Sequence, residues 1–539
     1  MKRFLILICI FSATNIFAQN VTTSAIFDAM QQEMKRTMSM SKSDPKIHFA
    51  AFKVGDYSEI SIIAARGGFV QEQQRKWVNT DVNLRVGTQK EDSSFFNAYT
   101  YTQSDLQEGG LSPEGIRAGL WAVVDKSYKE ALDIYSRKQG YKNKKAQEEV
   151  FDDFSPTTPM QDVKDFEETI FPVETLREIA KKTSAAGAIS ELEKFNTFID
   201  ISKENIFFLS SEGAKYTRQD LLIQITFLAK SRTKTGFEFH DLKTLSYASL
   251  KDIPTVQELE NIAQTFAKQT AKFTEAQKGT AFIGPVWLSG EASAEMFERA
   301  FIKKINNTRK NIFDRGGGEF YYDLGEFALK ENLKVLPVNF DVIDSPLQEE
   351  FNGKRTIGTY KVDDEGSKAE ALFLVKNGIL KDLPKTRSLI KGQTKTNGHA
   401  FTDWGKDLYA QASVKNLFFF PHETTAIENF KQKFMDYCKA EGLEYCYKIY
   451  SRNVAENNET LAIKINANTG EETPVYGFKN LPFNSRTLRD IKFAADDLTL
   501  YNTQKGISYV VPSVILSEAE LTPNQTAPTT KMLVTRPNI

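Results

Sequence analysis

The stretch GTYKVDDEGSKAEALFLVKNGILKD, residues 358–382, decides the fold class of the C-terminal half of the chain. Its apolar, strand-like runs flank Asn377-Gly378, a dipeptide that favours a two-residue hairpin turn because both residues tolerate positive φ. Earlier in the stretch, Asp363-Asp364-Glu365-Gly366 is typical of a tight turn, since Asp and Gly favour turn conformations. Its three carboxylates are alternatively a cation site. The stretch predicts antiparallel strands that short turns connect.

Strand-like runs of the same kind recur on both sides of this stretch, and isolated long helices separate them. Apolar side chains at helical spacing predict helices over 22–42, 116–138, 254–273 and 424–441. Strands and helices do not alternate as repeated βαβ units. The sequence therefore predicts an α+β fold, with an N-terminal α/β domain followed by a C-terminal domain of extended, mainly antiparallel sheets.

The first residues, MKRFLILICIFSATNIFAQN, have the features of a secretory signal peptide. Lys2 and Arg3 precede a short apolar run, and a small-residue cleavage site follows near Ala18-Gln19. The run is too short to span a bilayer, which needs roughly 20 apolar residues. We therefore expect an exported protein, periplasmic or extracellular. No later stretch is long and apolar enough to suggest a membrane span.

A mature chain of about 520 residues is too long for one hydrophobic core, so more than one domain is expected. We expect the following division: a signal peptide over 1–19, an N-terminal region over 20–275, a C-terminal domain over 276–518 and a Pro/Thr-rich tail over 519–539. The 69 Lys and Arg residues nearly balance 70 Asp and Glu residues. This balance argues against nucleic acid as a partner, because such proteins carry a basic patch or stripe.

Two cysteines, Cys438 and Cys446, remain after the signal peptide. They flank a predicted helix end at Gly442. In an oxidising compartment they form either a local disulfide or two buried free thiols, and their spacing does not decide between these. Neither belongs to a CxxC pair, which argues against a structural zinc site.

Common catalytic motifs are missing from the sequence. There is no phosphate-binding GxxxxGK[ST] loop and no GxSxG nucleophile elbow. The four histidines, His48, His240, His399 and His422, are too far apart to share a helix face as a zinc-ligand pair. A lone histidine in a strand or loop is more often a structural hydrogen-bond partner than a catalyst.

The segment GPVWLSGEASAEMFERAF, residues 284–301, predicts a short amphipathic helix. Ser289 is the expected cap of a helix that begins at Gly290. Glu291 and Glu295, one turn apart on the polar face, form a carboxylate pair for proton transfer or cation binding in one interpretation. In the other, they belong to a solvated acidic face on which Glu295 pairs with Arg299.

Several segments, taken in order, resemble the TldD/PmbA family, bacterial peptidases once described as modulators of DNA gyrase. The resemblance rests on these stretches: KIHFAAFKVGDYSEISIIAARGG, FFLSSEGAKYTR, GPVWLSGEASAEMF, GTYKVDDEGSKAEALFLVKNGILKD, TNGHAFTDW and VPSVIL. Each motif is short, but together they span nearly the whole mature chain.

The resemblance implies a metallopeptidase fold but not its zinc chemistry. In catalytic members a helix carries HExxxH, in which both histidines bind zinc and the glutamate is the general base. Those positions correspond here to Gly290, Glu291 and Glu295, so only the glutamate is present. The family's cysteine ligand has no evident counterpart, and His399 matches an NGH stretch without an assigned role. No zinc or other cofactor is therefore expected.

The family also contains subunits that lack the zinc motif and pair with an active one. The resemblance thus implies an exported, non-catalytic or peptide-binding partner subunit in proteolysis, within a homo- or hetero-oligomer with a TldD/PmbA-like subunit. A first alternative is a hydrolase that uses Glu291 with Glu295 or His399. A second alternative is an exported binding module unrelated to proteolysis.

Overall fold

The structure, a computed structural model, describes most of the chain between residues 21 and 524. The described residues are 21–41, 44–96, 103–105, 110–143, 151–166, 168–309, 325–402, 410–453, 459–503 and 506–524. The expected signal peptide and most of the expected tail lie outside these ranges.

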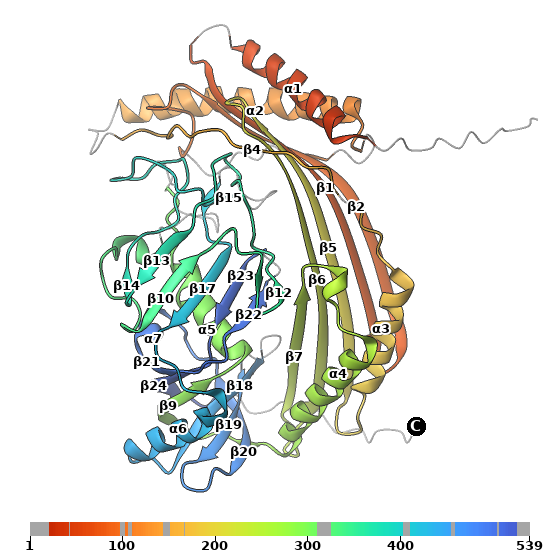
Figure 1. The fold of residues 1–539 in the computed structure, drawn as a ribbon, viewed down its shortest axis with the longest axis vertical. Coiled ribbons are helices and arrows are strands. Elements are labelled where there is room, and N and C mark those ends of the chain that lie inside the picture. The colour runs from red at the N-terminus through yellow and green to blue at the C-terminus, as the bar shows by residue number, and fades with distance from the viewer. Residues whose placement is uncertain are drawn as a thin grey trace, which may run out of the picture.

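A long, curved sheet forms the N-terminal half. Its seven strands are β1 (Ile47–Ala65), β2 (Gly68–Val86), β3 (Gln103–Asp105), β4 (Gln161–Asp162), β5 (Lys194–Ser210), β6 (Lys215–Arg232) and β7 (Glu238–Tyr247). The path runs β3-β2-β1-β5-β6, and both β4 and β7 pair with β6. Figure 1 shows the long strands bending around the C-terminal half, which lies in their hollow.

Helices cover the outer face of this sheet. They are α1 (Thr23–Met40), α2 (Pro113–Lys142), α3 (Val173–Ala186) and α4 (Val256–Ala271), followed by the short 3₁₀ turn η2 (Lys272–Glu275), while η1 (Leu250–Asp252) precedes α4. Side chains alternate across a strand, so Phe52 and Ile62 of β1 point to the same face. Phe52 packs beneath α1 and α2, and Ile62 packs beneath α3 and α4. The alternate residues of β1 therefore point inward, toward the C-terminal half.

Two further sheets build the C-terminal half. One has the order β21-β24-β9-β18-β19-β20-β8, with strands Ile491–Ala494, Val514–Leu521, Phe282–Leu288, Tyr445–Asn453, Glu459–Asn466, Glu472–Lys479 and Gln277–Lys278. The other has the order β14-β13-β10-β17-β23-β22, with strands Ile379–Leu380, Leu372–Lys376, Phe340–Asp344, Asn416–Pro421, Ser508–Val511 and Thr499–Asn502. Most neighbouring strands in both sheets are antiparallel.

Helices α5 (Glu291–Ala300), α6 (Ile427–Ala440) and α7 (Ser485–Arg489) pack on these sheets. Phe297 of α5 packs on Phe419 of β17 at 4.5 Å between ring centroids. Trp287 of β9 meets Phe430 of α6 at 5.6 Å. The remaining short elements are η3 (Ile302–Lys304), η4 (Glu326–Leu329), the β11–β12 hairpin (Glu350–Phe351 and Lys354–Arg355) and the β15–β16 pair (Ala400–Phe401 and Gln411–Ala412).

The α+β fold class predicted from the sequence is confirmed, and so is the hairpin at Asn377-Gly378. Both residues have positive φ, 51° and 74°, and they join β13 to β14. The question left open by Cys438 and Cys446 is also answered, because the two form a disulfide between the last turn of α6 and the start of β18.

The turn Asp363-Asp364-Glu365-Gly366 forms as predicted, but its carboxylates are buried instead of facing solvent. Asp363 accepts hydrogen bonds from the backbone N–H groups of Glu365 and Ser367. Asp364 accepts from Arg218 of β6 at 3.1 Å. Glu365 accepts from the backbone N–H of Arg387 at 2.6 Å. These protein donors serve the carboxylates, which argues against the alternative of a cation site.

A buried charged cluster next to this turn joins the two halves. The guanidinium groups of Arg85 and Arg387 each lie 4.0 Å from the ring centroid of Phe154. Arg85 belongs to the N-terminal half of the chain and Arg387 to the C-terminal half. Arg387 also pairs with Glu212 at 2.6 Å, and Arg85 with Asp92 at 3.3 Å. Phe154 belongs to the polar stretch 151–166, yet its ring is fully buried against the two arginines.

A second contact joins the halves near the far end of the sheet. The ring of Phe237, just before β7, stacks on Tyr476 of β20 at 4.2 Å between centroids. Thr235 shares a hydrogen bond with the Tyr476 hydroxyl at 2.8 Å. The curved sheet is thus attached to the C-terminal half at two separate places.

Replacing Gly366 with Ala should destabilise the protein by about 2–5 kcal/mol. Gly366 has φ +80°, where a Cβ costs about 1–2 kcal/mol. The added Cβ would also lie 2.6 Å from the Cβ of Ala214, and such overpacking costs about 1–3 kcal/mol. Thermal or urea unfolding measures the loss.

Gly353→Ala is the matched control. Gly353 has φ +72°, and no heavy atom lies within 4 Å of its added Cβ, so only the backbone strain applies. Equal losses in the two variants would show that contact between the turn and β5–β6 does not require glycine.

Candidate functional site

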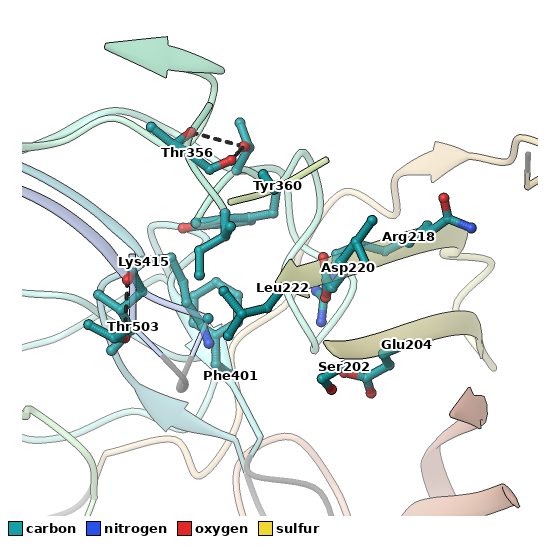
Figure 2. A pocket seen from close by; sticks show the side chains of 18 of the residues that line it. Ser202, Glu204, Arg218, Asp220, Leu222, Thr356, Tyr360, Phe401, Lys415 and Thr503 are labelled. Carbon is teal, nitrogen blue, oxygen red and sulfur yellow. Dashed lines mark hydrogen bonds and ion pairs between the residues drawn. The ribbon is translucent and has the colours of Figure 1, made fainter. Parts of the chain in front are cut away.

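A large cavity separates the inner face of the curved sheet from the C-terminal half. Its volume is about 2070 Å³. Figure 2 shows the two walls: Ser202, Glu204, Arg218 and Asp220 on strands of the sheet, and Lys415 and Phe401 from the C-terminal half.

The sheet wall follows from strand alternation in β1, β2, β5 and β6. Tyr57 of β1 lies directly opposite Trp77 of β2, and their rings stack at 5.1 Å with a 6° interplanar angle. Tyr57 also lies opposite Glu204 of β5, which in turn lies opposite Asp220 of β6. A Cβ on Gly55 would lie 2.5 Å from the Tyr57 ring, so glycine leaves room for that ring.

Ion pairs bind the charged side chains of this wall to one another. Lys53 Nζ lies 3.0 Å from Glu204 Oε1. Arg218 contacts Asp220 at 2.9 Å and Asp364 at 3.1 Å. Burial raises the pKa of a further charged group, Asp81, to about 6, against the opposing effect of Lys53.

The opposite wall places Lys415 among aromatic and hydroxyl groups. Lys415 Nζ lies 4.8 Å from the ring centroid of Phe401. Burial lowers the pKa of Lys415, and the neighbouring Arg218 lowers it further. The ring of Tyr360 meets that of Phe401 edge-on at 4.6 Å. A ligand between the walls therefore meets charged, aromatic and hydrogen-bonding groups.

Helix α5, which carries the predicted site residues, begins one residue later than expected. Gly290 is the N-cap, with φ 55°, and Glu291 is the first helical residue. No side chain caps the helix, so the predicted cap by Ser289 is wrong. Glycine accepts positive φ without steric cost, which explains its presence at this position.

Glu291 faces β7 across the gap between the two halves. The backbone of Thr244 hydrogen-bonds its carboxylate. Although Glu291 retains solvent exposure, the protein around the carboxyl group removes much of its water and raises its pKa from 4.5 to about 7. The negative charge of Asp241 adds to this rise, and Lys243 opposes it.

Glu295 forms the predicted ion pair with Arg299, since its Oε1 lies 2.7 Å from Arg299 Nε. This pair belongs to the interpretation in which the glutamates of α5 form a solvated acidic face. Glu298 pairs with Lys303 at 3.3 Å and lines the cavity. These residues do not fit zinc: Gly290 has no ligand atom, and Arg299 already holds Glu295. Among the described residues, no group of three or more His, Cys, Asp or Glu side chains is arranged to hold a metal ion.

His399 is buried away from α5, in a structural environment. Its Nδ1 lies 2.9 Å from the carbonyl oxygen of Asn397, and its Nε2 lies 3.4 Å from Asp344. Asp344 raises the pKa of His399, although burial alone would lower it. The structure therefore does not bring His399 into the group of residues around Glu291.

Sequence reasoning missed the sheet wall, although it identified the strands that build it. Lys53, Tyr57, Glu204 and Asp220 occupy alternate strand positions, where polar residues normally indicate a solvent-facing side. The only available signal was the mixture of charge and aromatic rings on that side.

No helix in the described part of the chain is long and apolar enough to cross a membrane.

The structure thus defines a class: a two-part α+β protein with a large cavity between a curved sheet and a C-terminal half that contains α5. Residues 283–435, including α5, match the family model of the PmbA/TldA metallopeptidase C-terminal domain. No curated protein matches the sequence.

Three solved structures share the fold. One, described as a candidate modulator of a DNA gyrase from Thermotoga maritima, has 15% identity and a TM-score of 0.60, covering 91% of this chain and 100% of its own. TldE from Thermococcus kodakarensis has 11% identity and a TM-score of 0.60, and the match covers 92% of this chain and 100% of TldE. A candidate modulator of DNA gyrase from Bacteroides thetaiotaomicron has 12% identity and a TM-score of 0.59, and the match covers 92% of this chain and 98% of that protein. These structures show the same fold over most of the chain, and residues 283–435 match a domain of the TldD/PmbA family.

Glu291→Gln should remove a pH-dependent loss of stability. In the unfolded chain the Glu291 carboxyl titrates near 4.5, and in the folded protein near 7. The stability that the raised pKa confers is present below about pH 4.5 and is lost as the pH rises to about 7. Because Glu291 keeps solvent contact, we expect less than about 1 kcal/mol.

Urea unfolding of both proteins at about pH 5 and about pH 8 measures this effect. The stability of the wild type relative to Glu291→Gln should fall over that interval. Glu298→Gln, on the same helix, is the control. An identical trend in both variants would show that the surroundings of Glu291 do not cause it.

Proposed function

We propose that this protein is an exported TldD/PmbA-like subunit without its own zinc site, which binds an extended peptide as a non-catalytic partner in proteolysis. The observation that carries the proposal is the content of α5. Gly290 stands at the first zinc-ligand position, and Glu295 at the second is held by Arg299. The buried face of α5 is intact, so the helix has kept its packing without the ligand pair.

The cavity supports the peptide-binding part of the proposal. Its volume of about 2070 Å³ exceeds the roughly 300–1,000 Å³ of most small-molecule pockets. Apolar residues such as Leu222 and Ile357 line it together with charged groups such as Arg218 and Lys415. A mixed lining of this kind suits a peptide, which presents both backbone hydrogen-bonding groups and varied side chains.

The partner-subunit part rests on the family. One structural neighbour is named TldE. The resemblance described above implies that members without HExxxH pair with an active subunit. We therefore propose a homo- or hetero-oligomer with a TldD/PmbA-like subunit. Co-purification with a protein that carries HExxxH would separate this role from that of an unrelated exported binding module.

Export is the third part of the proposal. The N-terminal sequence has the order of a signal peptide, and the disulfide between Cys438 and Cys446 suits an oxidising compartment, where such bonds persist. N-terminal sequencing of the protein recovered from the periplasm or the medium checks this part.

The purified mature protein should contain much less than one zinc ion per chain and should retain unfolded peptides without cleaving them. Elemental analysis, a chelator-controlled peptidase assay and a peptide-binding titration measure these outcomes on one preparation. Stoichiometric zinc with chelator-sensitive cleavage would overturn the proposal.

A second candidate function, a zinc-independent hydrolase, is favoured by one observation. The pKa of Glu291 is raised to about 7, which suits a general base near neutral pH. If this function holds, Glu291→Gln should lower the hydrolysis rate by about 100-fold or more, while Glu298→Gln leaves it unchanged. Equal rates for the two variants in a peptide-hydrolysis assay would reject it.

A further inference from the structure

Four side chains form a row across the sheet wall of the cavity. Trp77, Tyr57, Glu204 and Asp220 occupy directly opposed positions on β2, β1, β5 and β6. All four line the cavity, and Figure 2 shows Glu204 and Asp220 on neighbouring strands. Opposed residues have Cβ atoms about 5 Å apart, so one small ligand group can contact neighbouring members of the row.

The two carboxylates of this row are an unfavourable pair by themselves, because like charges directly opposite each other destabilise a sheet. Lys53 and Arg218 offset this repulsion in part. Both carboxylates still reach the cavity, since 26% of the Glu204 side chain and 39% of the Asp220 side chain are exposed. Glu204 also accepts a hydrogen bond from Tyr57, and both carboxylates still border the space that a cationic ligand would enter.

Asp81 adds a further negative charge beneath the row. It lies opposite Lys53 on β2, on the same face as Trp77 and Asn79, which line the cavity. Asp81 is only 6% exposed, and its Oδ2 has no hydrogen-bond partner among the described residues. A buried carboxylate oxygen of this kind favours a cation nearby, because it has little water to screen it.

The charges around the row leave a deficit of positive charge. Asp81, Glu204, Asp220 and Asp364 are the carboxylates, and Lys53, Arg218 and Lys415 are the cations. Lys415 lies on the opposite wall, so it repels a cationic ligand toward the sheet. The excess negative charge therefore faces the bound ligand at the row.

The aromatic half of the row suits the same ligand. Lys53 Nζ already lies 5.7 Å from the ring centroid of Tyr57 while it pairs with Glu204. An ammonium group between a carboxylate and an aromatic ring gains from both charge pairing and the cation–π interaction. The protein's own lysine thus shows the arrangement that a ligand amine would repeat on the cavity side.

We propose that Trp77, Tyr57, Glu204 and Asp220 form a subsite for a primary amine of the bound peptide. The amine is either the N-terminal ammonium group or a lysine side chain. This inference rests on the proposed peptide-binding function, and it names the chemical group that the cavity selects.

Calorimetric titration of the full mature protein with three short peptides tests the subsite. The peptides share one sequence: the first has a free N-terminus and no lysine, the second is N-acetylated with one lysine, and the third is N-acetylated without lysine. We expect the third to bind at least about tenfold more weakly than one or both of the others, as for the loss of one charge-assisted contact. Tighter binding of the first peptide identifies the amine as the N-terminal ammonium group, and tighter binding of the second identifies it as a lysine side chain.

Two variants link the binding to the row. Asp220→Asn removes the ion pair between Arg218 and Asp220 but leaves Arg218 paired with Asp364. Asp81→Asn changes a buried carboxylate whose Oδ2 has no hydrogen-bond partner among the described residues. Each should weaken the amine-bearing peptide about tenfold without changing the affinity of the blocked peptide. Asp133→Asn, which removes an exposed carboxylate of α2 that does not line the cavity, should leave both affinities unchanged.

Each outcome separates the subsite from the proposed function. Equal binding of all three peptides, unchanged in Asp81→Asn and Asp220→Asn, would overturn the subsite and leave peptide binding intact. The same loss in Asp133→Asn would also overturn it, because the effect would then be one of the protein's overall charge. No binding of any peptide would overturn the proposed function together with the subsite.

Discussion

The buried contact between Arg85, Phe154 and Arg387 is the constraint on which the rest of the structure depends. Two guanidinium groups contact one ring, and each needs its own carboxylate partner, because an unpaired buried charge is costly. Asp92 and Glu212 supply those partners. Since the ring, the cations and the anions come from separate segments, the contact forms only when both halves of the chain have folded and met.

This contact and the stacking of Phe237 on Tyr476 attach the curved sheet at two places, and the cavity lies along the sheet between them. The sheet therefore serves two purposes at once. Its outer positions pack beneath the helices, and its inner positions form a wall of paired charges and stacked rings. The strand period of two keeps these functions apart. A residue such as Glu204 can change the cavity without touching the core beneath the helices.

Local patterns predicted much of the fold. The hairpin at Asn377-Gly378 and the turn at Asp363-Asp364-Glu365-Gly366 depend on backbone preferences that nearby residues encode, and both form. The burial of Phe154 depends on Arg387 and that of Asp364 on Arg218, partners far away along the chain that a single sequence does not reveal. The candidate site likewise has a locally encoded part and a long-range part. The ion pair of Glu295 with Arg299 was predictable from helical spacing. The row from Trp77 to Asp220 was not, since it needs the register of four strands.

The N-cap at Gly290 has a consequence for how this lineage can change. A histidine at position 290 would have to adopt φ 55°, a conformation that costs an ordinary residue about 1–2 kcal/mol, and it would stand before the helix instead of on its face. A histidine at position 295 would also leave Arg299 without its carboxylate. A zinc-binding histidine pair at these positions would thus require a different backbone at the start of α5 along with new side chains. The path of the main chain opposes such a site as much as the side chains do, so no single substitution would create it.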